Sequence, residues 1–129
     1  MSDKRVLSVG QCFADHSAIS RTFQRHFAAE VVHADSASEA IERLRKENFD
    51  LVLVNRVLDA DGSDGLNLVK QIKAEEPPRD IPVMLVSNYE DSQRQAVELG
   101  ALPGFGKAAL GQPAMVARLK AALNGPTEA

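Results

Sequence analysis

Four short apolar runs of the chain end in glycine or polar residues that could do chemistry. Gly10-Gln11 follow the first of these runs, Asn55 ends another, and Ser87 and Lys107 follow the last two. A serine hydroxyl and a lysine ammonium can hold an anion such as a phosphate group, through hydrogen bonds and charge. Asn55 carries a neutral carboxamide, which makes hydrogen bonds but is not a useful nucleophile. The set therefore offers candidate anion-binding residues, Ser87 and Lys107, without an evident catalytic residue.

The bulk composition bounds the class of protein. The chain has 129 residues, 44% hydrophobic and 26% charged, with a net charge of -3. These values are typical of one globular domain, and they give no argument for binding nucleic acid or a membrane. Cys12 is the single cysteine, which excludes an internal disulfide and suits a reducing cytoplasm. We expect a cytoplasmic domain over residues 1–125 with a short tail over 126–129; the oligomeric state is left open.

Apolar runs alternate with amphipathic stretches along the whole sequence. Strands are expected at Val6–Val9, Val31–Val32, Leu51–Val54, Ile81–Val86 and Ala101–Phe105. Five helices are expected between and after these strands. The first carries Ile19, Phe23 and Phe27, the second begins at Ser36–Glu39, and the third carries Leu66, Val69 and Ile72 and ends before Pro77-Pro78. The fourth covers about Asp91–Leu99, and the fifth runs from Pro113 to about Gly125. Five strand–helix units predict an α/β fold with a doubly wound, five-stranded parallel sheet in the order 2-1-3-4-5.

This topology collects the polar residues at one place. Ligands of such sheets bind beyond the carboxyl ends of the strands, at the switch point between strands 1 and 3. Gly10, Asn55, Ser87 and Lys107 all follow strand ends, so they are expected to lie together. For Lys107 three states stay open: it reaches solvent, it binds a carbonyl group, or it takes an anion together with Ser87.

Three segments resemble the receiver domain of two-component response regulators. They are Asp50–Asn55 with Asp64-Gly65-Leu66, the run Ile81–Ser87, and Gly100-Ala101 with Lys107. The resemblance covers nearly the whole chain and implies the flavodoxin-like receiver fold. It also implies a phosphorelay site, in which an aspartate accepts a phosphoryl group with Mg²⁺, a serine or threonine, and a lysine around it.

The chain departs from that family pattern at several positions. Asn55 stands at the phosphoacceptor position, Gly10 and Gln11 stand at the metal-binding acid pair, and Gly104 stands at the switch aromatic. Ser87 and Lys107 keep the phosphate-holding half of the pattern. The resemblance therefore implies a degenerate receiver, or pseudo-receiver, without a catalytic residue, a metal site or a cofactor; Mg²⁺ binding is not expected.

These departures favour a protein–protein signalling module that does not need phosphate. By resemblance its partner, a histidine kinase or an output protein, would dock on the face formed by the fourth helix, fifth strand and fifth helix. Two alternatives stay open: a sensor that binds an anion or small ligand at the strand ends, and a receiver phosphorylated at a substitute acid such as Asp15 or Asp59. An enzyme is not expected, since no glycine-rich phosphate loop follows the first strand.

Local patterns give further expectations around the site. Asp15 or Ser17 is expected to cap the first helix, and Asn55 to form a hydrogen bond at its strand end. The polar segment 59–65 is expected to be a turn that caps the third helix, because its spacing fails the calcium-loop pattern. Arg56 is expected to point to solvent or to a partner.

Overall fold

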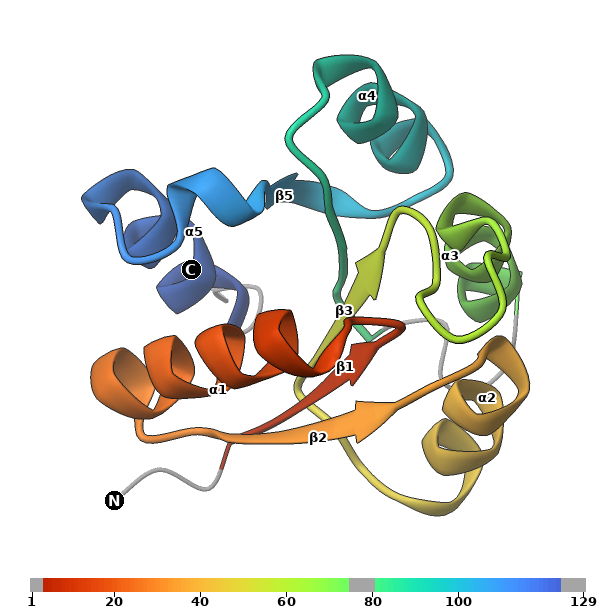
Figure 1. Cartoon of the computed structure of the whole chain (residues 1–129), viewed down its shortest axis with the longest axis horizontal. Coiled ribbons are helices and arrows are strands. Elements are labelled where there is room, and N and C mark those ends of the chain that lie inside the picture. The colour runs from red at the N-terminus through yellow and green to blue at the C-terminus, as the bar shows by residue number, and fades with distance from the viewer. Residues whose placement is uncertain (1–3, 75–80, 124–129) are drawn as a thin grey trace.

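The computed structural model describes residues 4–74 and 81–123 of the chain. Its five strands are all parallel and have the order β2-β1-β3-β4-β5, which confirms the prediction (Figure 1). The strands are β1 (Arg5–Val9), β2 (Glu30–Ala34), β3 (Leu51–Asn55), β4 (Val83–Val86) and β5 (Leu102–Phe105). The fourth strand thus begins two residues later than expected, and the second strand is longer than its apolar pair.

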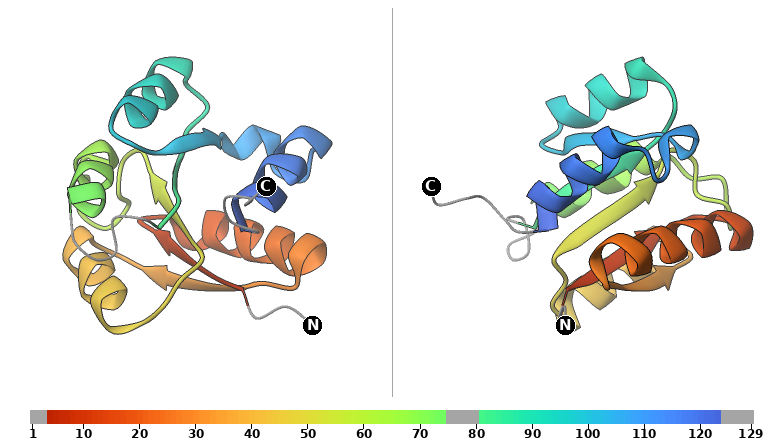
Figure 2. Two further views of the ribbon diagram at one scale, coloured as in Figure 1. Left: turned by 180° about the vertical axis from the view of Figure 1, so that it is seen from behind. Right: turned by 90° about the vertical axis from the view of Figure 1, so that its left-hand side faces the viewer.

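Five α-helices cover the two faces of the sheet. They are α1 (Phe13–Phe27), α2 (Ala37–Lys46), α3 (Gly65–Ala74), α4 (Glu90–Glu98) and α5 (Pro113–Leu123), and a 3₁₀ turn, η1 (Lys107–Ala109), precedes the last of them. Helices α1 and α5 lie on one face, and α2, α3 and α4 lie on the other (Figures 1 and 2). The expected breaks at 77–78 and 125–126, and the tail over 126–129, lie outside the described residues.

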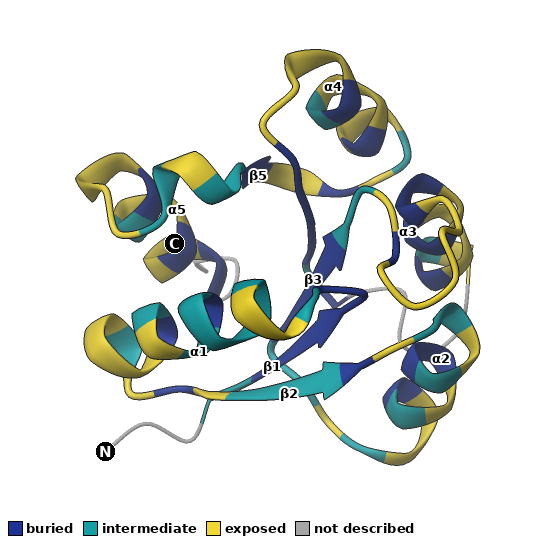
Figure 3. Ribbon diagram, viewed as in Figure 1, coloured by how far each residue is buried: buried dark blue, intermediate teal, exposed yellow. Residues whose placement is uncertain are grey.

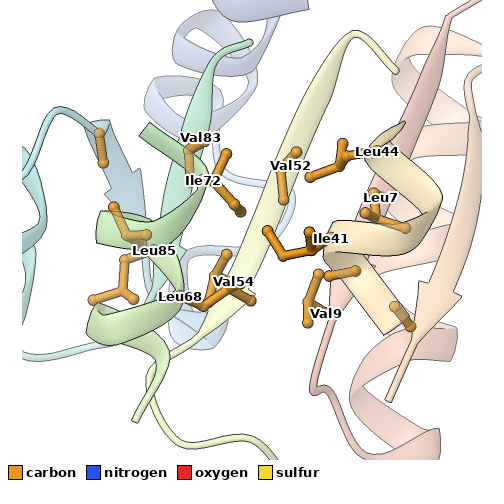
Figure 4. Packing of buried hydrophobic residues seen from close by; sticks show 14 of the residues in the cluster. Leu7, Val9, Ile41, Leu44, Val52, Val54, Leu68, Ile72, Val83 and Leu85 are labelled. Carbon is orange, nitrogen blue, oxygen red and sulfur yellow. The ribbon is translucent and has the colours of Figure 1, made fainter. Parts of the chain in front are cut away.

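Apolar packing on both faces explains the nearly continuous apolar strands. Under α2, α3 and α4, Ile41 and Ile72 pack on Val52 and Val54 (Figure 4). Under α1 and α5, a second cluster joins Phe23, Leu119 and other side chains to the opposite face. Strand β3 is buried at its first four residues, and the exposed surface lies on the outer sides of the helices and in the loops (Figure 3). A strand covered on both sides needs apolar residues at consecutive positions.

Helix starts follow the expected capping chemistry in three cases. The Ser36 hydroxyl accepts a hydrogen bond from the Glu39 amide at 3.2 Å, and helix α5 begins at Pro113. Residue 64 caps α3, since the Asp64 carboxylate accepts a hydrogen bond from the Leu66 amide at 2.9 Å. The polar-turn interpretation of residues 59–65 is therefore confirmed.

The expectation that Asp15 or Ser17 caps α1 is wrong. The N-cap residue is Cys12, in extended conformation and with no side-chain hydrogen bond to the helix backbone. Asp15 instead lies within the first turn, where a carboxylate is favoured by the helix dipole. Its side chain is consequently available for a longer-range contact.

No helix in the described part of the chain is both long and apolar enough to cross a membrane.

Candidate functional site

Asn55 makes a direct contact across the switch point of the sheet. Its side-chain Nδ2 donates a hydrogen bond to the Gly10 carbonyl at 3.0 Å, which confirms the expected hydrogen bond at the strand end. The Asp59 backbone amide donates to the same carbonyl at 2.9 Å. Two donors therefore occupy the Gly10 oxygen and join the ends of β1 and β3 to the loop that follows β3.

Gly10 is fixed as glycine by both conformation and space. Its φ is +78°, in the left-handed region that side chains with a Cβ rarely adopt. A Cβ at this position would stand 2.3 Å from Leu58 Cδ2, and Leu58 is only 1% exposed. The loop after β3 thus places an apolar side chain directly over Gly10.

Gln11 is buried without hydrogen bonds on its side chain. It is 2% exposed, and neither its amide oxygen nor its amide nitrogen has a partner within the described part of the chain. Buried polar atoms without partners are rare in folded proteins. The side-chain amide of Gln11 therefore has hydrogen-bonding groups that no described residue satisfies.

Two histidines from distant segments stack beside Gln11. The ring centroids of His16 and His33 lie 4.8 Å apart, and His33 Nε2 lies 3.2 Å from the Gln11 carbonyl oxygen. Burial, and then the neighbouring His33, lower the pKa of His16 below its ordinary value. Sequence spacing missed this pair, because only the pairing of β1 with β2 brings His33 beside α1.

Lys107 forms an ion pair with Asp15. The Lys107 Nζ and Asp15 Oδ2 lie 2.6 Å apart, and both side chains are about one-third exposed, at 34% and 32%. The hydrogen bond from Lys107 holds the pKa of Asp15 below its usual range, and Cys12 contributes a second hydrogen bond. The structure gives Lys107 a carboxylate partner from α1, which was not among the three states left open, while the lysine side chain keeps one-third of its surface in solvent.

Ser87 and Lys107 make no hydrogen bond to each other or to Asn55 among the described residues. The Ser87 hydroxyl accepts a hydrogen bond from the Tyr89 amide at 3.1 Å, which fixes the turn into α4. The Ser87 amide donates to the Phe105 carbonyl at 2.9 Å. Topology thus brings the predicted residues to one edge, where Asn55 binds Gly10 while Ser87 and Lys107 each have another partner.

Arg56 corrects another expectation, because its side chain is paired within the chain. Its Nη1 lies 2.9 Å from Asp64 Oδ1, and its Nε lies 3.2 Å from the Ser92 hydroxyl. The guanidinium therefore joins the loop after β3 to helix α4.

The residues at the site do not fit Mg²⁺. The three positions nearest the strand ends, Gly10, Gln11 and Asn55, supply no carboxylate. Across residues 4–74 and 81–123, no group of three or more histidine, cysteine, aspartate or glutamate side chains is placed to hold a metal ion. Mg²⁺ prefers an octahedron of oxygens that includes one or more carboxylates.

Strand β5 is irregular next to the site. Met84 pairs with Leu102 and Val86 pairs with Phe105, so β5 has one more residue than β4 between these pairs. The Gln93 side chain fills the gap: its Nε2 donates to the Leu85 carbonyl at 2.9 Å, and its Oε1 accepts from the Gly104 amide at 2.9 Å. A side-chain amide of α4 thus replaces backbone hydrogen bonds of the sheet.

Gly104 sits where no side chain fits. A Cβ at Gly104 would stand 2.2 Å from the Leu85 carbonyl oxygen. The Arg118 guanidinium from α5 donates to the Gly104 carbonyl, and the next residue, Phe105, is buried in the core beneath α1 and α5. A hollow of about 440 Å³ opens at this face, lined by Ser87, Gln93, Gly104, Phe105, Met115, Arg118 and their neighbours.

Comparison with known proteins identifies the family. The model of the response regulator receiver domain matches residues 13–120 of this chain. The chain belongs to this family. The receiver domain is similar to the transcriptional regulatory protein ZraR of Escherichia coli, with 33% identity over 90 residues. That match covers 67% of this chain but 19% of ZraR, so the receiver spans about a fifth of the length of that relative.

Solved structures agree with the fold of the receiver. A response regulator from Thermotoga maritima matches with a TM-score of 0.76 and 26% identity, covering 95% of this chain and 98% of that one. A protein from Chloroflexus aurantiacus matches with a TM-score of 0.83 and 21% identity, covering 95% and 99%. The chain is therefore a receiver domain of two-component signalling with the sheet order and five helices of that fold.

Proposed function

We propose that this receiver does not accept a phosphoryl group at position 55 and acts as a phosphate-independent protein–protein interaction module. The observation that carries the proposal is the Asn55 carboxamide, which donates to the Gly10 carbonyl at 3.0 Å at the end of β3. The lone pair of a carboxamide nitrogen is delocalised into the carbonyl group, so this nitrogen acts as a hydrogen-bond donor and is not a nucleophile for phosphorus.

The surroundings of Asn55 support the same proposal. Phosphoryl transfer needs positive charge beside the negatively charged oxygens of the transferring group, supplied by a metal ion and a cation. Leu58 lies over Gly10, and the Lys107 ammonium is paired with Asp15. We therefore expect neither Mg²⁺ binding nor catalysis at this site.

The proposed docking surface is the face formed by α4, β5 and α5. Gln93 binds α4 to the irregular part of β5, and Arg118 binds α5 to the Gly104 carbonyl. These contacts join the three elements through side chains of the chain itself. A histidine kinase or an output protein of the same cytoplasmic pathway would then meet a surface that is already set, with a hollow of about 440 Å³.

Two observations favour the alternatives. The buried, unpartnered amide of Gln11 favours a sensor that binds a small polar ligand at the strand ends. The contact of Lys107 with Asp15 favours Asp15 as a substitute phosphoacceptor, because the lysine then has a carboxylate beside it. Against this second alternative, Asp15 lies in the first turn of α1 and not at a strand end.

The test is labelling by acetyl phosphate with Mg²⁺, followed by intact mass, of the wild type and of Asn55→Asp. We expect no adduct on the wild type and no efficient labelling of Asn55→Asp, because Gly10 and Gln11 still supply no metal-binding acid. Efficient Mg²⁺-dependent labelling of Asn55→Asp would overturn this account of the site. Labelling of the wild type that Asp15→Asn abolishes would establish the substitute acid instead.

A further inference from the structure

The hollow beside strand β5 carries positive charge and no negative charge. Its volume is about 440 Å³, which lies in the size range of pockets that bind small molecules. Strand β5 is an edge of the sheet, and α4, β5 and α5 all contribute residues to the lining (Figures 1 and 2). Arg118 is the charged residue of the lining, which contains no aspartate or glutamate. The hollow thus has the opposite charge to the whole chain, whose net charge is -3.

Small residues leave the hollow open, and core residues give it an apolar wall. Phe105 and Met115 are only 5% and 3% exposed and belong to the core beneath α1 and α5. The segments around η1 contribute short side chains or none to the lining, at Gly104, Gly106, Ala108, Ala109 and Ala114. An apolar group of a ligand would therefore meet a wall that is already packed from behind.

Arg118 has capacity for an anionic partner. Its guanidinium donates to the Gly104 carbonyl, which places it beside β5, and it forms no ion pair among the described residues. Lys107, in the neighbouring 3₁₀ turn, is instead paired with Asp15. A guanidinium has five N–H donors in a planar fork that matches the two oxygens of a carboxylate.

The start of α5 lies next to this guanidinium. Ala114 and Arg118 are four residues apart, so they lie on one side of α5, and the arginine side chain leans toward the helix start. Ala114 and Met115 belong to the first turn and line the hollow. The first amides of a helix have no partner within the helix, and they favour negative charge. A carboxylate beside Arg118 would therefore lie near the positive end of α5.

We propose that this hollow binds a small organic carboxylate with an apolar body. The carboxylate would pair with Arg118, and the apolar body would cover Phe105 and Met115. A cationic ligand is opposed by the charge of Arg118. An inorganic anion leaves the apolar wall uncovered, and a neutral apolar molecule leaves the guanidinium without a counter-charge.

This inference goes beyond the phosphate-independent module, because it assigns a ligand and does not depend on the chemistry at Asn55. It also differs from a sensor at Gln11, which lies after β1. The hollow is part of the α4–β5–α5 face, so a bound carboxylate would change the surface that a partner meets there. Acetyl phosphate labelling tests the module, and the binding experiment tests the hollow, so failure of one is distinguishable from failure of the other.

The test is titration of the full chain with benzoate, followed by amide NMR. We expect saturable shifts at Gly104, Phe105 and Met115, with a Kd on the order of 1–10 mM for a ligand of this small size. Benzamide has the same ring without the charge, and acetate has the charge without the ring. Both are expected to bind at least about fivefold more weakly than benzoate, because each lacks one of the two contacts.

Matched substitutions on α5 make the test specific. Arg118→Met is expected to raise the Kd for benzoate about fivefold or more, whereas Lys120→Met, outside the hollow, leaves it unchanged. Ala114→Leu is expected to block binding by filling the hollow, whereas Ala117→Leu is not. All four positions are exposed, so folding is expected to be retained and is checked by circular dichroism.

Absence of saturable shifts with benzoate, or shifts confined to other parts of the chain, would overturn the proposal. Equal binding of benzamide would overturn it too, because the contact would then not depend on the carboxylate. Equal effects of Arg118→Met and Lys120→Met, or of the two leucine variants, would remove the binding from the hollow.

Discussion

Asp15 and Lys107, which are 92 positions apart in the sequence, meet at 2.6 Å between a carboxylate oxygen and the ammonium nitrogen. The contact joins the first turn of α1 to the turn that follows β5. A lysine at this edge thus has a carboxylate partner although Asn55 supplies none. This ion pair therefore connects the start of α1 to the turn after β5 at the carboxyl edge of the sheet.

The Asp15–Lys107 pair is expected to contribute a modest coupling energy. A double-mutant cycle with Asp15→Asn and Lys107→Met, measured by urea unfolding, is expected to give about 0.5–1 kcal/mol, since both side chains are one-third exposed. Because the folded pKa of Asp15 is lowered, this stability is present above the ordinary carboxyl pKa and is lost as pH falls through the folded value.

The control is the exposed pair Glu42–Lys46, whose side chains are 65% and 69% exposed. Its coupling energy is expected to be smaller than that of Asp15–Lys107 and to fall further when salt is added. A larger coupling for Glu42–Lys46 than for Asp15–Lys107 would contradict the assignment.

Gly10→Ala is expected to destabilise the chain more than Gly62→Ala. Both glycines have positive φ, at +78° and +71°, so both substitutions bear a similar conformational cost of about 1–2 kcal/mol. Only the Cβ at position 10 meets Leu58, while nothing lies within 4 Å of one at position 62. Chemical denaturation of the two variants therefore isolates the packing of Leu58 on Gly10, and equal losses would refute that packing.

Gln93→Ala is expected to lower the free energy of unfolding by about 1–3 kcal/mol, because it leaves the Leu85 carbonyl and the Gly104 amide without their partner. Gln95→Ala, at an exposed position on the same helix, is the control and is expected to change it by less than about 0.5 kcal/mol. Hydrogen exchange at Gly104 gives a local readout, which is expected to speed up in Gln93→Ala alone. Unchanged exchange would show that Gln93 does not hold the β5 irregularity.

His16 is expected to make stability depend on pH. Its folded pKa is lowered by burial, so the unfolded chain takes up a proton more readily. Stability is therefore complete above the ordinary histidine pKa of about 6.5 and falls as pH drops below it, by at most about 1.4 kcal/mol per pH unit for one proton. Urea unfolding at about pH 7.5 and 5.5, either side of that pKa, is expected to show this loss in the wild type and less of it in His16→Gln. Identical losses in the two proteins would assign the effect to another group.

Much of the fold could be predicted from the sequence because it depends on local patterns. The apolar runs predict the five strands, and their alternation with helices predicts the parallel order. Ser36 and Pro113 predict two of the helix starts. The same strand ends brought Gly10 and Asn55 together. These features follow from hydrophobic periodicity, helix capping and sheet topology, and all three can be recognised in a single sequence.

The parts that were missed depend on side chains from distant segments. The sequence around Asp15 gives no sign of its ion pair with Lys107. A polar residue near the start of a helix instead favours an N-cap, which is what was predicted for Asp15. The insertion of Gln93 into the sheet follows from an extra residue in β5, which the apolar pattern of 101–105 does not reveal. Leu58 lies in the loop after β3, and no sequence pattern indicates that it is buried on Gly10. Such contacts are set by three-dimensional packing and not by sequence spacing.

The central claim, that the Asn55 site has lost its phosphoryl chemistry, is tested most directly by amide NMR of the wild-type chain with beryllofluoride and Mg²⁺. Beryllofluoride imitates a phosphoryl group on a carboxylate, and Asn55 offers it none. The account predicts no saturable shifts at Asn55, Ser87 and Lys107. Saturable, Mg²⁺-dependent shifts at these residues would contradict it and would show that a carboxylate of this chain still accepts the group.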